Sequence, residues 1–181
     1  SVTPTTITLP LTSNSVLERY EGMLVKLPQQ LTVTDNDNLG RYGEVVLANG
    51  RLLIPTMTTP PGTAAKTLQA QNDLNRFLLD DGSLVVNPPL IPYPSPSLSA
   101  THTLRSGDTV TGMTGVLDYS FGQYRLHPTS VPAFVATNPR PSSPTAVGGT
   151  LKVASFNVYN YFNTFAGCYV SCRGAENATE F

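Results

Sequence analysis

The stretch from Ser106 to Pro128, SGDTVTGMTGVLDYSFGQYRLHP, gives the clearest β-hairpin in the sequence. Two arms, residues 110–118 and 123–127, alternate apolar and polar side chains on either side of a short turn. Gly112 and Gly115 interrupt the first arm, which predicts a β-bulge or a sharp bend in that strand. Small closed barrels need such bends, so the hairpin favours a barrel.

Shorter β patterns lie on both sides of this hairpin. RYEGMLVKL (19–27) and LTVTD (31–35) predict two strands, and EVVLANGRLLIPT (44–56) predicts a second hairpin. The second hairpin would turn at Asn49-Gly50, because Asn-Gly is the strongest short turn signal. VPAFVAT (131–137) is a candidate for a last strand.

The middle of the chain has a different pattern. Residues 63–82 begin with spaced alanine and leucine residues that predict a helix of one to three turns, followed by a strand end and a turn. A Pro-rich segment, 87–99, is then expected to run over the surface, because proline cannot donate to a sheet ladder.

These elements predict a mainly β protein. Five strands and one short helix in about 120 residues match the size and order of an OB-fold barrel. An immunoglobulin-like sandwich is the alternative, although it accommodates the central helix less well. The composition divides the chain into a linker (1–17), a β-rich body (18–137), a Pro-rich linker (138–149) and a C-terminal segment (150–181).

Charge limits the classes of function. The whole chain has 11 basic and 12 acidic residues, and charged residues are only 13% of the total. Residues 1–138 hold eight basic and ten acidic residues, a net charge of −2. Tight electrostatic binding of a polyanion is therefore not expected. Few charges with abundant Thr, Ser and Asn are typical of secreted bacterial β-proteins, and no apolar run is long enough to span a membrane.

Two cysteines, Cys168 and Cys172, lie close together near the C-terminus. Both histidines lie 41 or more residues upstream without metal-like spacing, so we expect no zinc site. A local disulfide, which implies an oxidising compartment, is one interpretation, and two free thiols are the other.

Three stretches together carry a resemblance to a known family. RYEGMLVKLPQQLTVTDNDNLGRYGEV (19–45), LQAQNDLNRFLLDDG (68–82) and GDTVTGMTGVLDYSFGQYRLHPT (107–129) resemble the OB-fold domain of large secreted bacterial nucleases of the ExeM type. In that family the OB domain precedes a nuclease domain of the endonuclease/exonuclease/phosphatase superfamily, which has a deoxyribonuclease-I-like fold. LKVASFNVYNYFNT (151–164) resembles the first strand of that nuclease domain.

The resemblance implies that residues 150–181 are the truncated start of a nuclease domain. Asn157 would then lie at its catalytic centre, where an amide can bind a divalent metal through oxygen and a phosphoryl group through nitrogen. The parent enzyme would use Mg²⁺ or Ca²⁺, but this chain lacks the remaining catalytic residues, so we expect no cofactor and no enzymatic activity. The isolated strand is expected to be disordered, or to borrow a sheet edge, within the chain or in a dimer.

Two surfaces of the body are candidates for contact with single-stranded or duplex nucleic acid. Arg41 and Tyr42 lie between two glycines on a predicted loop, where a base could stack. The second surface is the hairpin, whose returning strand is expected to turn Arg125 and His127 outward. Its candidate residues are Tyr119, Phe121, Tyr124, Arg125 and His127. In both places the alternative is an ordinary structural role, for example Arg41 paired with Glu44.

Two acidic motifs are interpreted as turns. DNDNLG (35–40) fails the EF-hand pattern, because Leu39 and Val46 stand where oxygen ligands are needed. In DDG (80–82), adjacent carboxylates on a strand point to opposite faces and cannot act as an acid–base pair. We therefore expect a non-catalytic OB-fold module that assists nucleic-acid binding next to the nuclease domain. The alternatives are a structural module that packs on that domain and, less favoured, a surface- or sugar-binding β-domain.

Overall fold

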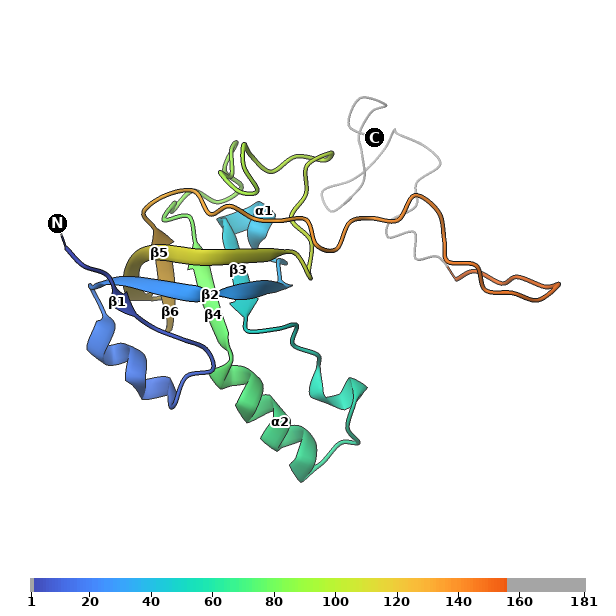
Figure 1. The fold of residues 1–181 in the computed structure, drawn as a ribbon, viewed down its shortest axis with the longest axis horizontal. Coiled ribbons are helices and arrows are strands. Elements are labelled where there is room, and N and C mark those ends of the chain that lie inside the picture. The colour runs from blue at the N-terminus through green and yellow to red at the C-terminus, as the bar shows by residue number, and fades with distance from the viewer. Residues whose placement is uncertain (1, 156–181) are drawn as a thin grey trace, which may run out of the picture. The chain divides into compact units, whose positions relative to one another are not determined.

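The computed structural model describes residues 2–155 (Figure 1). Of these, residues 2–140 form one compact unit, and residues 141–155 belong to a second. The strands of the first unit are β1 (Thr5–Thr6), β2 (Leu24–Asp35), β3 (Glu44–Ala48), β4 (Arg76–Asp80), β5 (Thr109–Ser120) and β6 (Gln123–Pro128). The helical segments are η1 (Asn14–Tyr20), α1 (Leu39–Tyr42), η2 (Pro55–Met57) and α2 (Thr63–Leu74). In the second unit, the described residues 141–155 are exposed and contain no helix or strand.

The six strands form one sheet in the order β1-β2-β3-β4-β6-β5, so the prediction of a mainly β fold is confirmed. The long strand β2 also pairs with β5, in addition to its pairs with β1 and β3. Thr32 lies at the changeover, opposite both Ala48 of β3 and Thr109 of β5. The β4–β6 pair is parallel, whereas β2–β3, β3–β4, β5–β6 and β2–β5 are antiparallel.

The predicted hairpin of β5 and β6 forms, but its turn is shorter than the predicted 119–122, because β5 continues to Ser120 and only two residues separate it from Gln123. Gly112 lies at a bulge, because Pro28 and Gln29 of β2 stand opposite this single residue of β5. Gly115 is needed for a different reason. A Cβ there would lie 2.4 Å from the backbone oxygen of His127, so the two strands approach too closely for a side chain.

The second predicted hairpin, at Asn49-Gly50, does not form, since residues 51–54 form no strand. The reason is that β4, which is distant in sequence, takes the free edge of β3, with Glu44 opposite Asp80 and Ala48 opposite Arg76. The predicted strand at 131–137 is also reduced, to a single bridge between Val135 and Thr109.

Two segments expected at the surface contribute to the core instead. In the linker predicted at residues 1–17, Ile7, Leu9 and Leu11 alternate toward the core and are buried. The side chain of Gln29 fixes this segment, because its amide pairs with both the N–H and the carbonyl of Leu9. In the Pro-rich segment, Ile91 and Tyr93 are buried, although the flanking prolines keep it out of the sheet.

The predicted helix is α2, which extends away from the sheet (Figure 1). Only Ala65 of α2 is buried, so the helix contributes little to the core. The core consists of side chains from the strands, with additional leucines from η1, α1 and the connecting segments. The outer face of β3, β4 and β6 is therefore left uncovered by α2, and the candidate site lies there.

Candidate functional site

A groove of about 690 Å³ lies on the outer face of the sheet, where β3, β4, β5 and β6 contribute neighbouring side chains. The loop after β4 and the hairpin turn also line it, and we call it the β4–β6 groove. Its polar side chains are Glu44, Asp80, Ser83, Asp118, Ser120, Arg125 and His127. Its apolar and aromatic side chains are Tyr42, Leu84, Val86 and Phe121. Its volume is within the range of small-ligand sites in proteins.

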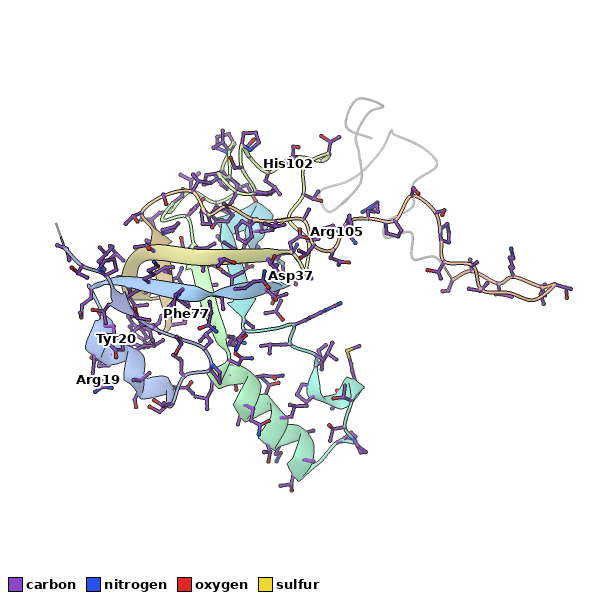
Figure 2. All side chains as sticks on the ribbon, viewed as in Figure 1. Arg19, Tyr20, Asp37, Phe77, His102 and Arg105 are labelled. Carbon is purple, nitrogen blue, oxygen red and sulfur yellow. The ribbon has the colours of Figure 1, made fainter. Side chains whose placement is uncertain are left out.

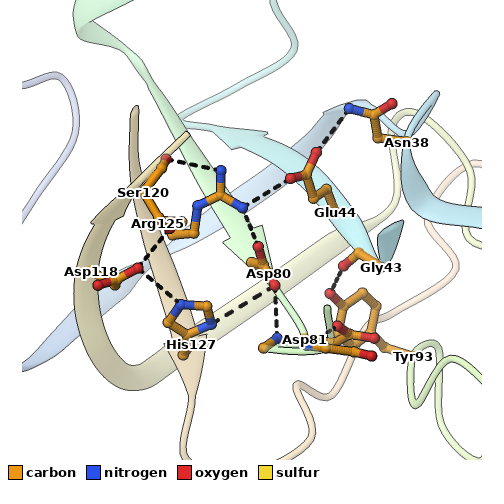
Figure 3. A network of polar contacts seen from close by, with 12 residues as sticks. Asn38, Gly43, Glu44, Asp80, Asp81, Tyr93, Asp118, Ser120, Arg125 and His127 are labelled. Atoms are coloured by element: carbon orange, nitrogen blue, oxygen red, sulfur yellow. Dashed lines mark hydrogen bonds and ion pairs between the residues drawn. The ribbon is translucent and has the colours of Figure 1, made fainter. Parts of the chain in front are cut away.

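Arg125 of β6 connects the strands that line the groove, because it forms hydrogen bonds to residues of β3, β4 and β5 (Figure 3). Its Nη1 donates to Glu44 Oε1 at 2.9 Å and to Asp80, and its Nη2 donates to the carbonyl of Ser120 at 3.1 Å. Glu44 also accepts a hydrogen bond of 2.8 Å from Asn38. The register explains the arrangement, because Glu44 stands opposite Asp80 across β3 and β4. Two carboxylates therefore neutralise this guanidinium.

The expectation that Arg125 points into solvent is wrong. It does lie on the face opposite the buried Leu126, as the alternation predicts, but it is only 2% exposed. The carboxylates of two neighbouring strands surround it, and its Cζ lies 5.0 Å from the centroid of the Phe121 ring. Its Nε has no hydrogen-bond partner among the described residues. Arg125 is thus a structural cation within the groove and not a free anchor for phosphate.

His127 lies between two carboxylates on the same face. Its Nε2 is 3.5 Å from Asp118 Oδ2, and its Nδ1 is 3.8 Å from Asp80 Oδ1. Asp118 Oδ2 also accepts a hydrogen bond of 2.7 Å from the hydroxyl of Ser120. This hydrogen bond, together with His127, lowers the pKa of Asp118, so its carboxylate stays ionised at neutral pH. The groove holds more acidic than basic groups.

The hairpin turn presents an aromatic ring to solvent at the edge of the groove. Phe121 is 81% exposed, and both Phe121 (φ 51°) and Gly122 (φ 80°) have positive φ, as a two-residue type I′ turn requires. Asn-Gly is the usual sequence for this turn, because a left-handed conformation costs most side chains roughly 1–2 kcal/mol. Apart from its contact with Arg125, a large exposed ring at this position therefore does not stabilise the turn.

An apolar segment continues from the other side of the groove. Leu84, Val85, Val86 and Leu90 are 85%, 56%, 50% and 64% exposed, respectively. They belong to the connection between β4 and β5, and Leu84 and Val86 line the groove. Consecutive exposed apolar side chains on a folded domain are typical of a binding surface.

The structure brings four of the predicted site residues into one groove: Tyr42, Phe121, Arg125 and His127. Arg41 is exposed next to them, and its guanidinium lies 5.0 Å from the centroid of the Tyr42 ring. It does not pair with Glu44, which is bound to Arg125.

Tyr119 and Tyr124 lie in a separate hollow, which Arg76 also lines. Their ring centroids are 4.8 Å apart, and Tyr124 donates a hydrogen bond of 2.5 Å to Glu18. This hydrogen bond raises the pKa of Tyr124 to about 12. Tyr124 is therefore engaged with η1 and not with the β4–β6 groove.

Basic side chains do not gather at the groove. Figure 2 labels Arg19 and Arg105, which lie toward opposite ends of β2. In the described part of the chain, no three His, Cys, Asp or Glu side chains form a group that could hold a metal ion. Asn157, Cys168 and Cys172 lie outside the described residues. No helix within residues 2–155 is long and apolar enough to cross a membrane.

Sequence reasoning missed Glu44, Asp80, Asp118 and the apolar loop after β4. The hairpin register contained part of the signal, because a turn at Phe121-Gly122 places Asp118 opposite Arg125. The pairing of Arg125 with Glu44 and Asp80 depends instead on the parallel contact of β4 with β6, which no local pattern predicts.

Comparison with known proteins gives one relationship. No curated protein and no solved structure matches the chain. A family model described as a domain of unknown function, DUF8508, matches residues 13–137, and the chain therefore belongs to that family.

Proposed function

We propose that residues 13–137 form a non-catalytic OB-fold module of a secreted bacterial nuclease. In this proposal the module holds single-stranded nucleic acid in the β4–β6 groove, next to a metal-dependent phosphodiesterase domain that begins near residue 150. The observation that carries the proposal is the position of the groove, which coincides with the ligand face of an OB-fold barrel.

Strand pairing supports the barrel. An OB fold is a five-stranded, partly open Greek-key barrel. Here the pairs run from β2 to β3, β4, β6 and β5, and from β5 back to β2. The bulge at Gly112 and the close approach at Gly115 supply the bends that closure requires.

The position of the groove supports ligand binding. OB folds bind oligonucleotides or oligosaccharides on the face of their second and third strands, between the loops that follow the first and fourth strands. In the proposed barrel these strands are β3 and β4, and the loops are residues 36–43 and 121–122. Glu44, Asp80, Tyr42 and Phe121 come from these four elements and line one groove.

The chemistry of the groove favours bases over phosphates. Exposed rings are platforms on which any base can stack, at about 1–3 kcal/mol per base. By contrast, the guanidinium of Arg125, which lines the groove, is already neutralised and Asp118 is ionised, so that among the described residues Arg41, next to the groove, is left to contact a phosphate. We therefore expect weak binding with the bases facing the groove and the phosphates facing solvent. The nuclease domain would supply most contacts to the backbone.

The test is a fluorescence-anisotropy titration of the 181-residue chain with labelled single-stranded and duplex oligonucleotides of equal length. We expect micromolar binding to the single strand, weaker binding to the duplex, and a shallow dependence on salt, because few counterions are released. Tyr42→Ala should weaken binding, whereas Tyr20→Ala, a matched change outside the groove, should not. Absence of binding at low salt by a folded chain would refute the proposal.

A second candidate function is packing on the nuclease domain without contact to substrate. The observation that favours it is the exposed apolar segment around Leu84, Val86 and Leu90. Mixing the chain with a separately produced nuclease domain and measuring complex formation by size-exclusion chromatography tests it. If Leu84→Ser abolishes a complex and no oligonucleotide binds, the module is structural.

A further inference from the structure

Asp118 differs from the other ionisable side chains of the β4–β6 groove in its exposure. The side chains of Arg125, Asp80, Glu44 and His127 are 3%, 7%, 13% and 32% exposed, whereas that of Asp118 is 45% exposed. The less exposed side chains already interact with one another, because Arg125 pairs with Glu44 and Asp80, and His127 lies close to Asp80. Asp118 is therefore the charged group that a ligand in the groove would meet first.

The hydrogen bonds of Asp118 leave it able to accept more. Ser120 and His127 both approach Oδ2, at 2.7 Å and 3.5 Å. The second carboxylate oxygen, Oδ1, can thus accept a hydrogen bond from a ligand. The exposed ring of Phe121, three residues further along the hairpin, provides a stacking surface in the same groove.

An ionised carboxylate next to an aromatic ring discriminates among bases. Cytosine, adenine and guanine carry exocyclic amines, which donate hydrogen bonds, and carboxylates accept from the N4 amine of cytosine in known protein–DNA contacts. Thymine and uracil present carbonyl oxygens in place of that amine, and these oxygens repel a carboxylate.

We propose that Asp118 is a specificity-determining residue, which makes the β4–β6 groove prefer unpaired bases with an exocyclic amine over thymine or uracil. This inference rests on the proposed binding of single-stranded nucleic acid. It adds that the bound base stacks on Phe121 and donates its amine to Asp118. The negative charge of Asp118 also keeps phosphate groups away from this part of the groove.

The test compares oligo(dC) with oligo(dT) of equal length, because both are pyrimidines and differ at the position of the amine. Anisotropy titrations of the 181-residue chain should give about 5- to 10-fold tighter binding of oligo(dC). Asp118→Asn should remove this preference, since an amide can donate to the thymine carbonyl. Asp37→Asn makes the same charge change at an exposed position outside the groove and should keep the preference. Thermal melts confirm that both variants fold.

The outcomes separate the inference from the proposed function. Equal binding of oligo(dC) and oligo(dT), both weakened by Tyr42→Ala, would overturn the role of Asp118 while leaving the nucleic-acid site in place. A preference for oligo(dC) that persists in Asp118→Asn would also overturn it, because another group would then select the base. Failure of both oligonucleotides to bind would overturn the proposed function and this inference together.

Discussion

Replacing Phe121 with Asn separates binding from stability. In the wild type, Phe121 has a left-handed conformation that costs roughly 1–2 kcal/mol, and Asn tolerates this conformation better. The variant loses the contact of the buried Arg125 with the ring, and such contacts contribute about 0.5–1 kcal/mol at exposed sites and about 2 kcal/mol where the cation is desolvated. These effects oppose each other and are of similar size, so we expect the free energy of unfolding to change by no more than about 1 kcal/mol in either direction.

The same substitution should damage binding. Loss of one stacked base costs about 1–3 kcal/mol, which corresponds to about 5- to 150-fold in affinity for a single-stranded oligonucleotide. Urea denaturation followed by circular dichroism measures stability, and anisotropy measures affinity. Phe121→Tyr keeps the ring and should keep the affinity. A loss of more than about 2 kcal/mol in stability would mean that the ring is structural, and unchanged affinity would mean that no base stacks on it.

Three further predictions concern the architecture of the groove. Arg125→Met leaves Asp80 and Glu44 as buried carboxylates without a cation, so urea denaturation should give a loss of about 3–5 kcal/mol; a loss under 1 kcal/mol would contradict a buried ion network. Gly115→Ala places a Cβ 2.4 Å from backbone oxygen and should cost about 1–3 kcal/mol in the same assay, whereas an unchanged stability would mean that β5 and β6 separate easily. The lowered pKa of Asp118 stabilises the fold above its unfolded pKa, 3.8, and this contribution disappears as the pH falls through the lower folded pKa. Ser120→Ala should therefore reduce the melting temperature at neutral pH, with a difference that vanishes in acid; a difference independent of pH would refute this origin.

The strands could be predicted where the signal is local. The β5–β6 hairpin is specified by alternation and by a glycine in its turn, and the bulge at Gly112 follows from a glycine within a strand. The hairpin predicted at Asn49-Gly50 does not form, and the local sequence does not show the physical reason. A distant strand, β4, pairs with β3 and removes the edge on which a local return strand would lie.

The candidate site could be predicted only in part, again because local patterns do not show which distant strands pair. Arg125 and His127 of the returning strand could be placed on one face from their alternation alone. The burial of Arg125 could not, because it requires Asp80 from a strand 45 residues away to lie beside it. Ile7 and Tyr93 illustrate a related limit of prediction. They lie in Thr- and Pro-rich segments, whose composition predicts surface exposure, yet both side chains are buried in the core.

The most direct test of the central claim is an NMR titration of the ¹⁵N-labelled 181-residue chain with a single-stranded oligo(dC). We expect shifts to cluster on Tyr42, Leu84, Val86, Asp118 and Phe121, which come from separate elements but line one groove. Shifts concentrated on the Tyr119–Tyr124 hollow, or no shifts with a folded protein, would contradict a nucleic-acid site in the β4–β6 groove.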